Sequence, residues 1–371
     1  MIFDSESVFE ENVITVLKQH GWKDGVLRYP TERDLLDNWK DILYRNNNDI
    51  DRLGKYPLTD GEMAQIIEQI ETLRTPLALN SFVNGRTVSI TRDNKEDVAH
   101  FGKEVSLYIY DRKEIAGGKS TYQIAQQPVY PAKNKMLNSR RGDLVLLING
   151  MPLIHIELKK SGIPVSQATN QIEKYAHEGV FTGLFRLVQI FVAMNPDDAV
   201  YFANPGVDKF NPSYYFHWAD YNNEPICGGQ NLGKDEWKLF IGGTSGTAGL
   251  LSIPMAHQLI GFYTIADSAD GCLKVLRSYQ YIAANAISDV VRKCDWEQRP
   301  ATPGRPGGYV WHTTGSGKTM TSFKSAQLIA DSHDADKVVF LMDRIELGTQ
   351  SLKEYRSFAD SETEVQGTEN T

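Results

Sequence analysis

The sequence predicts an α/β protein with two domains, each combining helices with a β-sheet. Its 371 residues leave room for two or three domains, and an apolar fraction of 41% supports buried cores. Strand-like segments surround an Asn149-Gly150 turn, and a glycine-rich loop at 312–319 lies between an apolar run and a helical segment. We therefore expect a first α/β domain over 1–255 and the start of a nucleotide-binding domain with a parallel sheet over 256–371.

Helices are expected to dominate the N-terminal part. An amphipathic helix is predicted from Ser7 to His20, because four apolar side chains share one of its faces: Phe9, Val13, Val16 and Leu17. Ser7 and Glu10 have the spacing of a capping box at the start of this helix. Residues 27–80 are polar and also favour helix.

The segment from 105 to 160 is strand-like. Residues 143–148 and 153–158 flank Asn149-Gly150 and predict a β-hairpin. A helix is expected over 166–177, followed by two strands over 187–195 and 199–204. A domain boundary is expected between about 245 and 275, after the loop at 242–247.

The second domain is predicted as one βαβ unit. A helix over 278–293 and a Pro- and Gly-rich loop over 298–308 precede a strand at 309–311. The glycine-rich loop, a helix over 318–330 and a buried strand over 337–343 then follow.

Composition limits the classes of function. The net charge of −8 indicates no polyanion partner for the chain as a whole, so nucleic-acid contact must come from local basic clusters. The candidates, each also explained as a solvated face, are Lys133, Lys135, Arg140, Arg141, Lys159 and Lys160. The three cysteines form neither a metal spacing nor a disulfide framework. With no signal peptide and no membrane-spanning apolar run, we expect a soluble cytoplasmic protein without a membrane partner.

The glycine-rich loop is a candidate phosphate-binding site. Backbone N–H groups of Thr314, Gly315, Ser316 and Gly317 and the following helix N-terminus are expected to surround the phosphates of ATP. Lys318 is expected to reach the β- and γ-phosphates, and Thr319 to bind Mg²⁺. His312 occupies the position where the usual motif has its first glycine.

Asp143, Glu157 and Lys159 form a second candidate site. Two carboxylates can hold Mg²⁺, and Lys159 can position or activate a water. A two-residue turn pairs 143 with 156, so a bulge or a three-residue loop, with Gly150 as the left-handed residue, is required to bring both carboxylates to one face. Charged residues placed in edge strands for solubility are the alternative. Gln171 and Tyr175 follow on one helix face.

Taken together, these motifs resemble the R (motor and nuclease) subunit of type I restriction enzymes over nearly the whole chain. The resemblance implies a PD-(D/E)xK nuclease domain that cuts double-stranded DNA with Mg²⁺, using Asp143, Glu157 and Lys159. It implies that Gln171 and Tyr175 support cleavage and that Glu10 completes the site, although Glu10 also fits a helix cap. The related type III subunits carry the nuclease after the motor, which disfavours them.

For the second domain, the resemblance implies the first RecA-like lobe of a superfamily 2 helicase-like translocase. Arg277 and Gln280 resemble its adenine-reading motif, although Gln280 also fits an ordinary helix start. Residues 343–347 and Gln350 resemble motif Ia, which contacts DNA. The Mg²⁺-binding second motif and the second lobe are not in this sequence, so we expect an N-terminal fragment of a longer subunit.

The same resemblance implies an ATP-dependent site-specific deoxyribonuclease that works with modification (methyltransferase) and specificity subunits. Two other functions fit the residues. One is a non-catalytic DNA-binding or assembly fragment, and the other is a DNA-repair helicase-nuclease.

Overall fold

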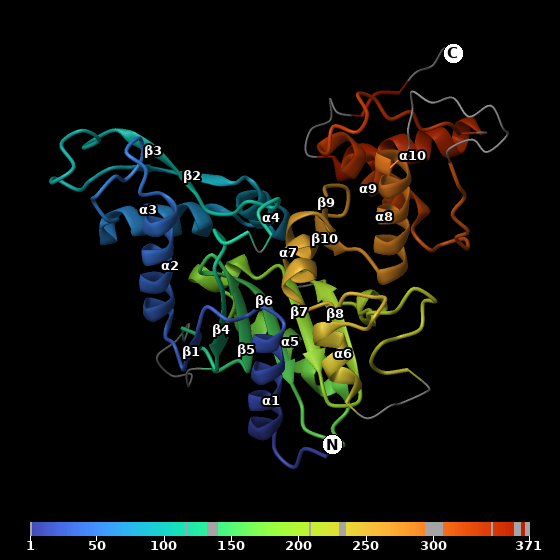
Figure 1. Ribbon diagram of the computed structural model, residues 1–371, viewed down its shortest axis with the longest axis horizontal. Helices are drawn as coiled ribbons and strands as arrows, with labels where there is room; N and C mark the ends of the chain where they lie inside the picture. The colour runs from blue at the N-terminus through green and yellow to red at the C-terminus, as the bar shows by residue number, and fades with distance from the viewer. Residues whose placement is uncertain are drawn as a thin grey trace.

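The computed structural model describes residues 2–115, 117–131, 140–207, 209–229, 235–293, 307–342, 344–359 and 365–367. Its centre is a six-stranded sheet in the order β1-β4-β5-β6-β7-β8, whose strands β4 to β8 are drawn in shades of green in Figure 1. The strands are β1 (Val26–Arg28), β4 (Tyr122–Gln126), β5 (Leu144–Ile148), β6 (Met151–Leu158), β7 (Ile190–Met194) and β8 (Ala199–Ala203). The β1–β4 and β6–β7 pairs are parallel and the other pairs antiparallel, which confirms an α/β fold with parallel strands.

The sheet is covered on both faces. Every residue of β4 to β8 is buried, which explains why these strands read as nearly continuous apolar runs. Ile148 pairs with Met151, so Asn149 and Gly150 form a two-residue turn with φ of 52° and 83°. The expected hairpin and the two expected strands that follow it are confirmed.

Two helices pack against this sheet, and a third packs on one of them. Helix α1 (Glu6–Gln19) contacts α6 (Glu236–Gly242), and the rings of Phe9 and Trp237 lie 5.2 Å apart. Helix α5 (Val165–Glu178) packs on β6 and β7. Two short 3₁₀ helices, Gly183–Leu187 and Pro212–Tyr214, lie before β7 and after β8.

The predicted capping box of the first helix is wrong. Ser5 is the N-cap, and its hydroxyl accepts a hydrogen bond from the Val8 N–H at 3.3 Å. Because the helix begins before Ser7, Glu10 lies too far into the helix to cap it, and its carboxylate bonds to other residues.

A helical arm with a β-hairpin extends from the sheet, at the upper left of Figure 1. It contains α2 (Glu32–Asn46), α3 (Asp60–Thr72) and α4 (Pro76–Asn84), then β2 (Thr87–Thr91) paired antiparallel with β3 (Glu104–Tyr108). The helix preference predicted over 27–80 is confirmed by these helices.

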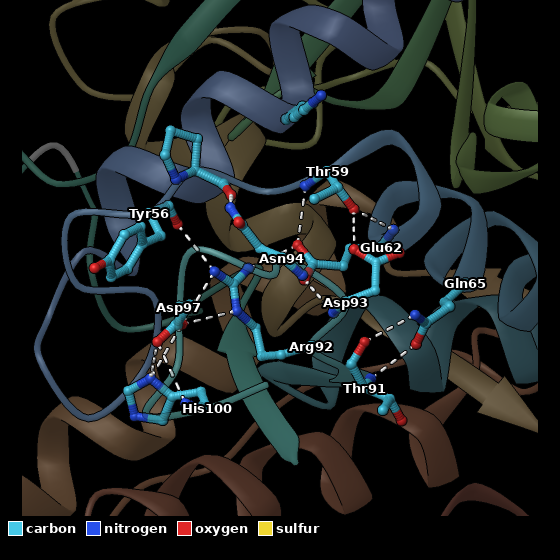
Figure 2. Close-up of polar contacts among 12 residues, drawn as sticks. Tyr56, Thr59, Glu62, Gln65, Thr91, Arg92, Asp93, Asn94, Asp97 and His100 are labelled. Carbon is cyan, nitrogen blue, oxygen red and sulfur yellow. Dashed lines mark hydrogen bonds and ion pairs between the residues drawn. The ribbon is translucent and has the colours of Figure 1, made fainter. Parts of the chain in front are cut away.

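The arm encloses a buried ion network around Arg92 (Figure 2). Arg92 lies 2.6 Å from Glu62 Oε2 and 3.2 Å from Asp97 Oδ2, and all three side chains are almost completely buried. The second oxygen of Glu62 accepts hydrogen bonds from the backbone N–H groups of Asp93 and Asn94 at 2.8 and 3.3 Å. Arg92 therefore connects the start of α3 to the segment between β2 and β3.

The C-terminal part of the chain contains a small hairpin near the centre of Figure 1 and helices at its upper right. Helix α7 (Ile253–Gly261) leads to β9 (Thr264–Asp267) and β10 (Cys272–Val275), which pair antiparallel. Helix α8 (Ser278–Lys293) packs on α9 (Lys318–Asp331), and α9 contacts α10 (Ile345–Phe358). The predicted helices at 278–293 and 318–330 are confirmed, whereas most of the predicted 298–308 loop lies outside the described residues.

The predicted βαβ unit is wrong in its strands. Residues 309–311 and 337–342 form no strand, and Trp311, Val339 and Leu341 are 87%, 84% and 86% exposed. A β-strand is stabilised by hydrogen bonds to a neighbouring strand. Within the described part of the chain, neither segment pairs with a neighbouring strand. The domain division at residue 255 stays a prediction. Among the described residues, no helix is long and apolar enough to cross a membrane.

We expect Arg92→Met to lower the free energy of unfolding by about 3–5 kcal/mol, because it leaves the Glu62 and Asp97 carboxylates buried without their cation. Arg33→Met is the matched control. Arg33 also bridges two carboxylates, but it is 62% exposed and screened by solvent, so its loss should lower the free energy of unfolding far less. Urea unfolding of both variants measures the difference, and equal losses would contradict a stabilising role for the buried network.

Candidate functional site

A β-bulge sets the relative position of the two candidate carboxylates. The β5–β6 register shifts between Leu146, which pairs with Ile154, and Leu147, which pairs with Pro152. Leu153 is therefore the extra residue, and from there Leu144 opposes Ile156. Extending this register by one pair places Asp143 opposite Glu157. The predicted bulge is present, but it lies in β6 rather than at Gly150.

The two carboxyl groups interact in a nearly dry environment. Burial, followed by the charge of Glu157, holds the pKa of Asp143 well above its ordinary value. Burial also raises the pKa of Glu157 to about 8, although Lys159 opposes this shift. Asp143 Oδ2 accepts a hydrogen bond from the Leu158 N–H at 2.7 Å. Both Glu157 oxygens are buried and make no hydrogen bond of normal geometry, although Asp143 and Lys159 lie close enough to lower the pKa of Glu157 against the effect of burial.

Lys159 lies at the end of β6 beside these carboxylates. Its ammonium donates to the Leu158 carbonyl at 2.9 Å and lies 3.5 Å from Glu157 Oε1. It also lies 3.6 Å from Glu6 Oε1, at the start of α1. The cation and both carboxylates therefore meet at one end of the sheet.

Glu10 of α1 faces the same region. Its carboxylate accepts hydrogen bonds from the side-chain amides of Gln126 at 2.5 Å and Gln127 at 3.2 Å. The backbone N–H of Gln127 in turn donates to the Asp143 carbonyl at 2.7 Å. Burial raises the pKa of Glu10, and its charge contributes to raising the pKa of Asp143. The structure therefore places Glu10 near the carboxylate pair.

Gln171 and Tyr175 of α5 lie together near the carboxylates. Gln171 Nε2 donates to the Tyr175 hydroxyl at 2.7 Å, and that hydroxyl donates to the Arg141 carbonyl at 2.9 Å. Burial, with the charge of Glu157 second, raises the pKa of Tyr175 to about 12. A hollow of about 330 Å³ opens beside them, lined by Arg140, Gln167, Asn170, Gln171, Lys174 and Tyr175.

Two buried residues beside Glu157, His155 and Tyr130, were not predicted from the sequence. The His155 Nε2 lies 3.4 Å from Glu157 Oε2, and its Nδ1 lies 2.8 Å from the Tyr130 hydroxyl. Burial lowers the pKa of His155 to about 4, so the ring is neutral at neutral pH. The period of a strand could have revealed His155, because residues two apart share a face.

The donor set fits a hard divalent cation. Asp143 and Glu157 offer carboxylate oxygens, and the buried Glu157 oxygens without hydrogen-bond partners are the observation that favours a cation there. The described residues contain no group of three or more His, Cys, Asp or Glu side chains arranged to hold a metal. A cation here would therefore keep water or substrate oxygens as further ligands, which Mg²⁺ tolerates well.

The candidate phosphate loop comes immediately before α9. Gly315 and Gly317 have φ of 78° and 79°, which glycine adopts without strain. Lys318, the first residue of α9, donates from its ammonium to the Thr313 carbonyl at 3.1 Å. Thr319 follows it in the first turn, and Thr314 precedes the glycines.

Gln280 and Arg277 lie against this loop. Gln280 Nε2 donates to the Ser316 and Gly317 carbonyls at 3.2 and 3.3 Å, and its Oε1 accepts from the Arg277 N–H at 2.9 Å. A Cβ on Gly317 would lie 2.4 Å from Gln280 Nε2, so the contact requires glycine. A cavity of about 230 Å³ joins the loop to the segment after β8, and its lining includes Arg277, Gln280, Gly315, Ser316, Gly317 and Phe216.

The remaining candidate basic and motif residues lie outside the described residues or make contacts with residues that belong to neither candidate site. Lys133, Lys135 and Asp343 lie outside the described residues, as does Cys294. Arg140 is paired with Glu178 at 2.9 Å. Lys160 donates to the Asp4 carbonyl at 3.3 Å. Arg344 caps α10, which carries Leu347 and Gln350.

The chain is similar to proteins of known class over most of its length. Residues 4–210 match the family model described as the N terminus of type I restriction enzyme R protein, and residues 279–371 match the SWI2/SNF2 ATPase model. Endonuclease subunits of type I restriction enzymes from Staphylococcus saprophyticus and Staphylococcus aureus MSSA476 are 31% and 32% identical over 100% and 97% of this chain. The chain spans 35% and 34% of their lengths. An Escherichia coli endonuclease subunit is 26% identical over 84% of this chain and 99% of its own length.

The raised pKa values predict a pH-dependent stability. Between about 4.5, the ordinary pKa of Glu157, and about 8, its folded value, the folded protein holds a proton that the unfolded chain releases. In EDTA, the free energy of unfolding should therefore fall as pH rises through this window, by at most about 1.4 kcal/mol per unit for this group. Urea unfolding at four pH values tests this. Glu157→Gln should flatten the slope, whereas an unchanged slope would show that Glu157 is not its source.

Proposed function

The chain belongs to the type I restriction enzyme R protein family, and from that premise we propose that Asp143, Glu157 and Lys159 form a Mg²⁺-dependent nuclease site of the PD-(D/E)xK type. The observation that carries the proposal is the pair of facing carboxylates beside a lysine, with the Glu157 oxygens buried and unsatisfied. Its substrate is the phosphodiester backbone of double-stranded DNA.

Each residue of the site has a distinct role in this proposal. Asp143 and Glu157 hold Mg²⁺, which supplies Lewis-acid stabilisation of the charge that develops on the phosphate. Lys159 is fixed by its hydrogen bond to the Leu158 carbonyl and by the nearby Glu157, so its ammonium can orient the attacking water or stabilise negative charge. Glu10, whose carboxylate accepts hydrogen bonds from Gln126 and Gln127, completes the acidic site beside Asp143.

The DNA backbone is proposed to approach from α5. Gln171 and Tyr175 form one wall of the hollow there, and Asn170 and Lys174 supply an amide and an ammonium for phosphate oxygens. The Lys174 side chain is 62% exposed, and its ammonium makes only a long ion pair with Glu178, at 4.0 Å. The ammonium is therefore accessible to a phosphate. An approach along α5 would bring the DNA backbone beside the carboxylates although the net charge of the chain is −8.

We expect Asp143→Ala, Glu157→Gln and Lys159→Ala each to reduce DNA cleavage by the complete restriction complex about 100-fold or more, because several kcal/mol of transition-state stabilisation are removed. Glu173→Gln changes a half-exposed carboxylate on α5 and is the matched control, which should cleave normally. ATP hydrolysis should persist in all variants. Normal plasmid cleavage by Glu157→Gln would reject the nuclease assignment and favour a non-catalytic assembly role.

The second proposed site binds ATP with Mg²⁺. Supporting it are the two left-handed glycines, the α9 N-terminus, and the cavity that joins the loop to Arg277 and Gln280. Lys318 would exchange the Thr313 carbonyl for phosphate oxygens, Thr319 would bind Mg²⁺, and Gln280 and Arg277 would contact the adenine side. In the whole protein this site would drive DNA translocation, in a complex with modification and specificity subunits.

Replacing Lys318 should weaken nucleotide binding selectively. We expect Lys318→Ala to raise the Kd for ATP–Mg²⁺ about 10- to 100-fold, because a hydrogen bond to a charged group contributes about 1.5–3 kcal/mol. Lys337→Ala changes an exposed lysine of the same lobe and should leave the Kd unchanged. Titration with a fluorescent nucleotide measures both, and equal Kd values for the two variants would argue against this loop as the phosphate site.

A further inference from the structure

His155 is a histidine buried where the neighbouring positions of β6 are apolar. Its side chain is completely inaccessible and packs edge-on against Phe181 and Phe191, with ring centroids 5.4 and 5.9 Å away. An apolar side chain would fill this space without burying a polar atom, whereas a buried imidazole costs free energy unless both of its nitrogens have hydrogen-bond partners. Only Nδ1 has a hydrogen-bond partner, the Tyr130 hydroxyl at 2.8 Å.

The Tyr130 contact determines which nitrogen carries the proton. If the hydroxyl donates to Nδ1, the neutral ring carries its hydrogen on Nε2, which lies 3.4 Å from Glu157 Oε2. When Glu157 is ionised, as cation binding requires, the opposite tautomer would direct a lone pair at a carboxylate oxygen in a dry environment and would leave the Tyr130 proton without an acceptor. The first tautomer satisfies more groups and is the one that the contacts favour.

Glu157 is therefore flanked on both oxygens. Lys159 approaches Oε1 at 3.5 Å, and His155 approaches Oε2 at 3.4 Å. Both separations exceed a normal hydrogen bond, so a small side-chain movement forms either bond once Glu157 carries its charge. Because His155 is enclosed by aromatic rings and bonded to Tyr130, its ring is the more rigid of the two neighbours.

We propose that His155, oriented by Tyr130, is a positioning residue that donates Nε2–H to Glu157 and fixes this carboxylate for cation binding. This inference rests on the proposed nuclease function. Outer partners of a ligating carboxylate orient it, and their loss typically costs about 10- to 100-fold in metal affinity. His155 transfers no proton to the substrate. Its replacement should therefore lower the affinity for the cation.

The test measures Mn²⁺ binding to the whole protein by electron paramagnetic resonance, without nucleotide, so that the ATP site does not contribute. His155→Leu should weaken Mn²⁺ binding about 10- to 100-fold, and Tyr130→Phe should weaken it in the same direction by a smaller factor. His155→Gln retains an N–H donor and should recover part of the affinity. Phe181→Leu alters packing on the same imidazole without touching its hydrogen bonds, and it should bind Mn²⁺ as the unaltered protein does.

The outcomes distinguish the proposed nuclease site from the positioning role of His155. Glu157→Gln should abolish the strongest Mn²⁺ site, and its failure to do so would overturn the proposed nuclease site itself. If Glu157→Gln abolishes binding while His155→Leu and Tyr130→Phe leave it unchanged, only the positioning role is overturned. Equal losses in Phe181→Leu and Tyr130→Phe would also overturn it, since packing alone would then account for the effect. If His155→Leu does not fold, the comparison of Tyr130→Phe with Phe181→Leu decides.

Discussion

The structure of the first domain depends on holding two carboxyl groups opposite each other inside a covered sheet. Like charges in a dry site repel, and burial alone raises the pKa values of both Asp143 and Glu157. Such a pair persists because strong packing surrounds it: every residue of β4 to β8 is buried, and α5 closes over β6 and β7. The cost of the pair is offset by the core, and a cation that binds there would displace the proton that the raised pKa of Glu157 retains.

The local geometry of this pair follows from one inserted residue. Without Leu153 as the bulge, Asp143 would face Ile156, and the carboxylates would lie on opposite sides of the sheet. The sequence indicated that either a bulge or a three-residue loop was required, because a two-residue turn at Asn149-Gly150 pairs residue 143 with residue 156. It could not show where the bulge lies, because every residue from Met151 to Leu158 is compatible with a buried strand and bulge position depends on packing from both faces.

Local patterns predicted the helices α1, α5, α8 and α9 because each carries its own periodicity or loop signal in the sequence. The capping residue of α1 was misassigned, since Ser5 and Ser7 are both acceptable caps and only the backbone distinguishes them. The strands expected at 309–311 and 337–343 failed for a different reason. A β-strand depends on a partner that sequence does not specify, and the described residues place none beside these segments. His155 was missed because a single histidine in an apolar run forms no motif, although its position two residues before Glu157 places it on the same face of the strand.

The two candidate sites are held together by different physical means. The carboxylate pair belongs to a hydrogen-bonded sheet, so its geometry is fixed before any ligand arrives, as a metal-dependent hydrolytic site requires. Within the described residues no β-sheet supports the glycine loop, and its Lys318 and Ser316 side chains donate to the Thr313 carbonyl. Its position is set by Gln280 and by the packing of α8 on α9. A nucleotide there would replace the loop's internal bonds with phosphate contacts, so ligand binding, rather than the fold, would complete that site.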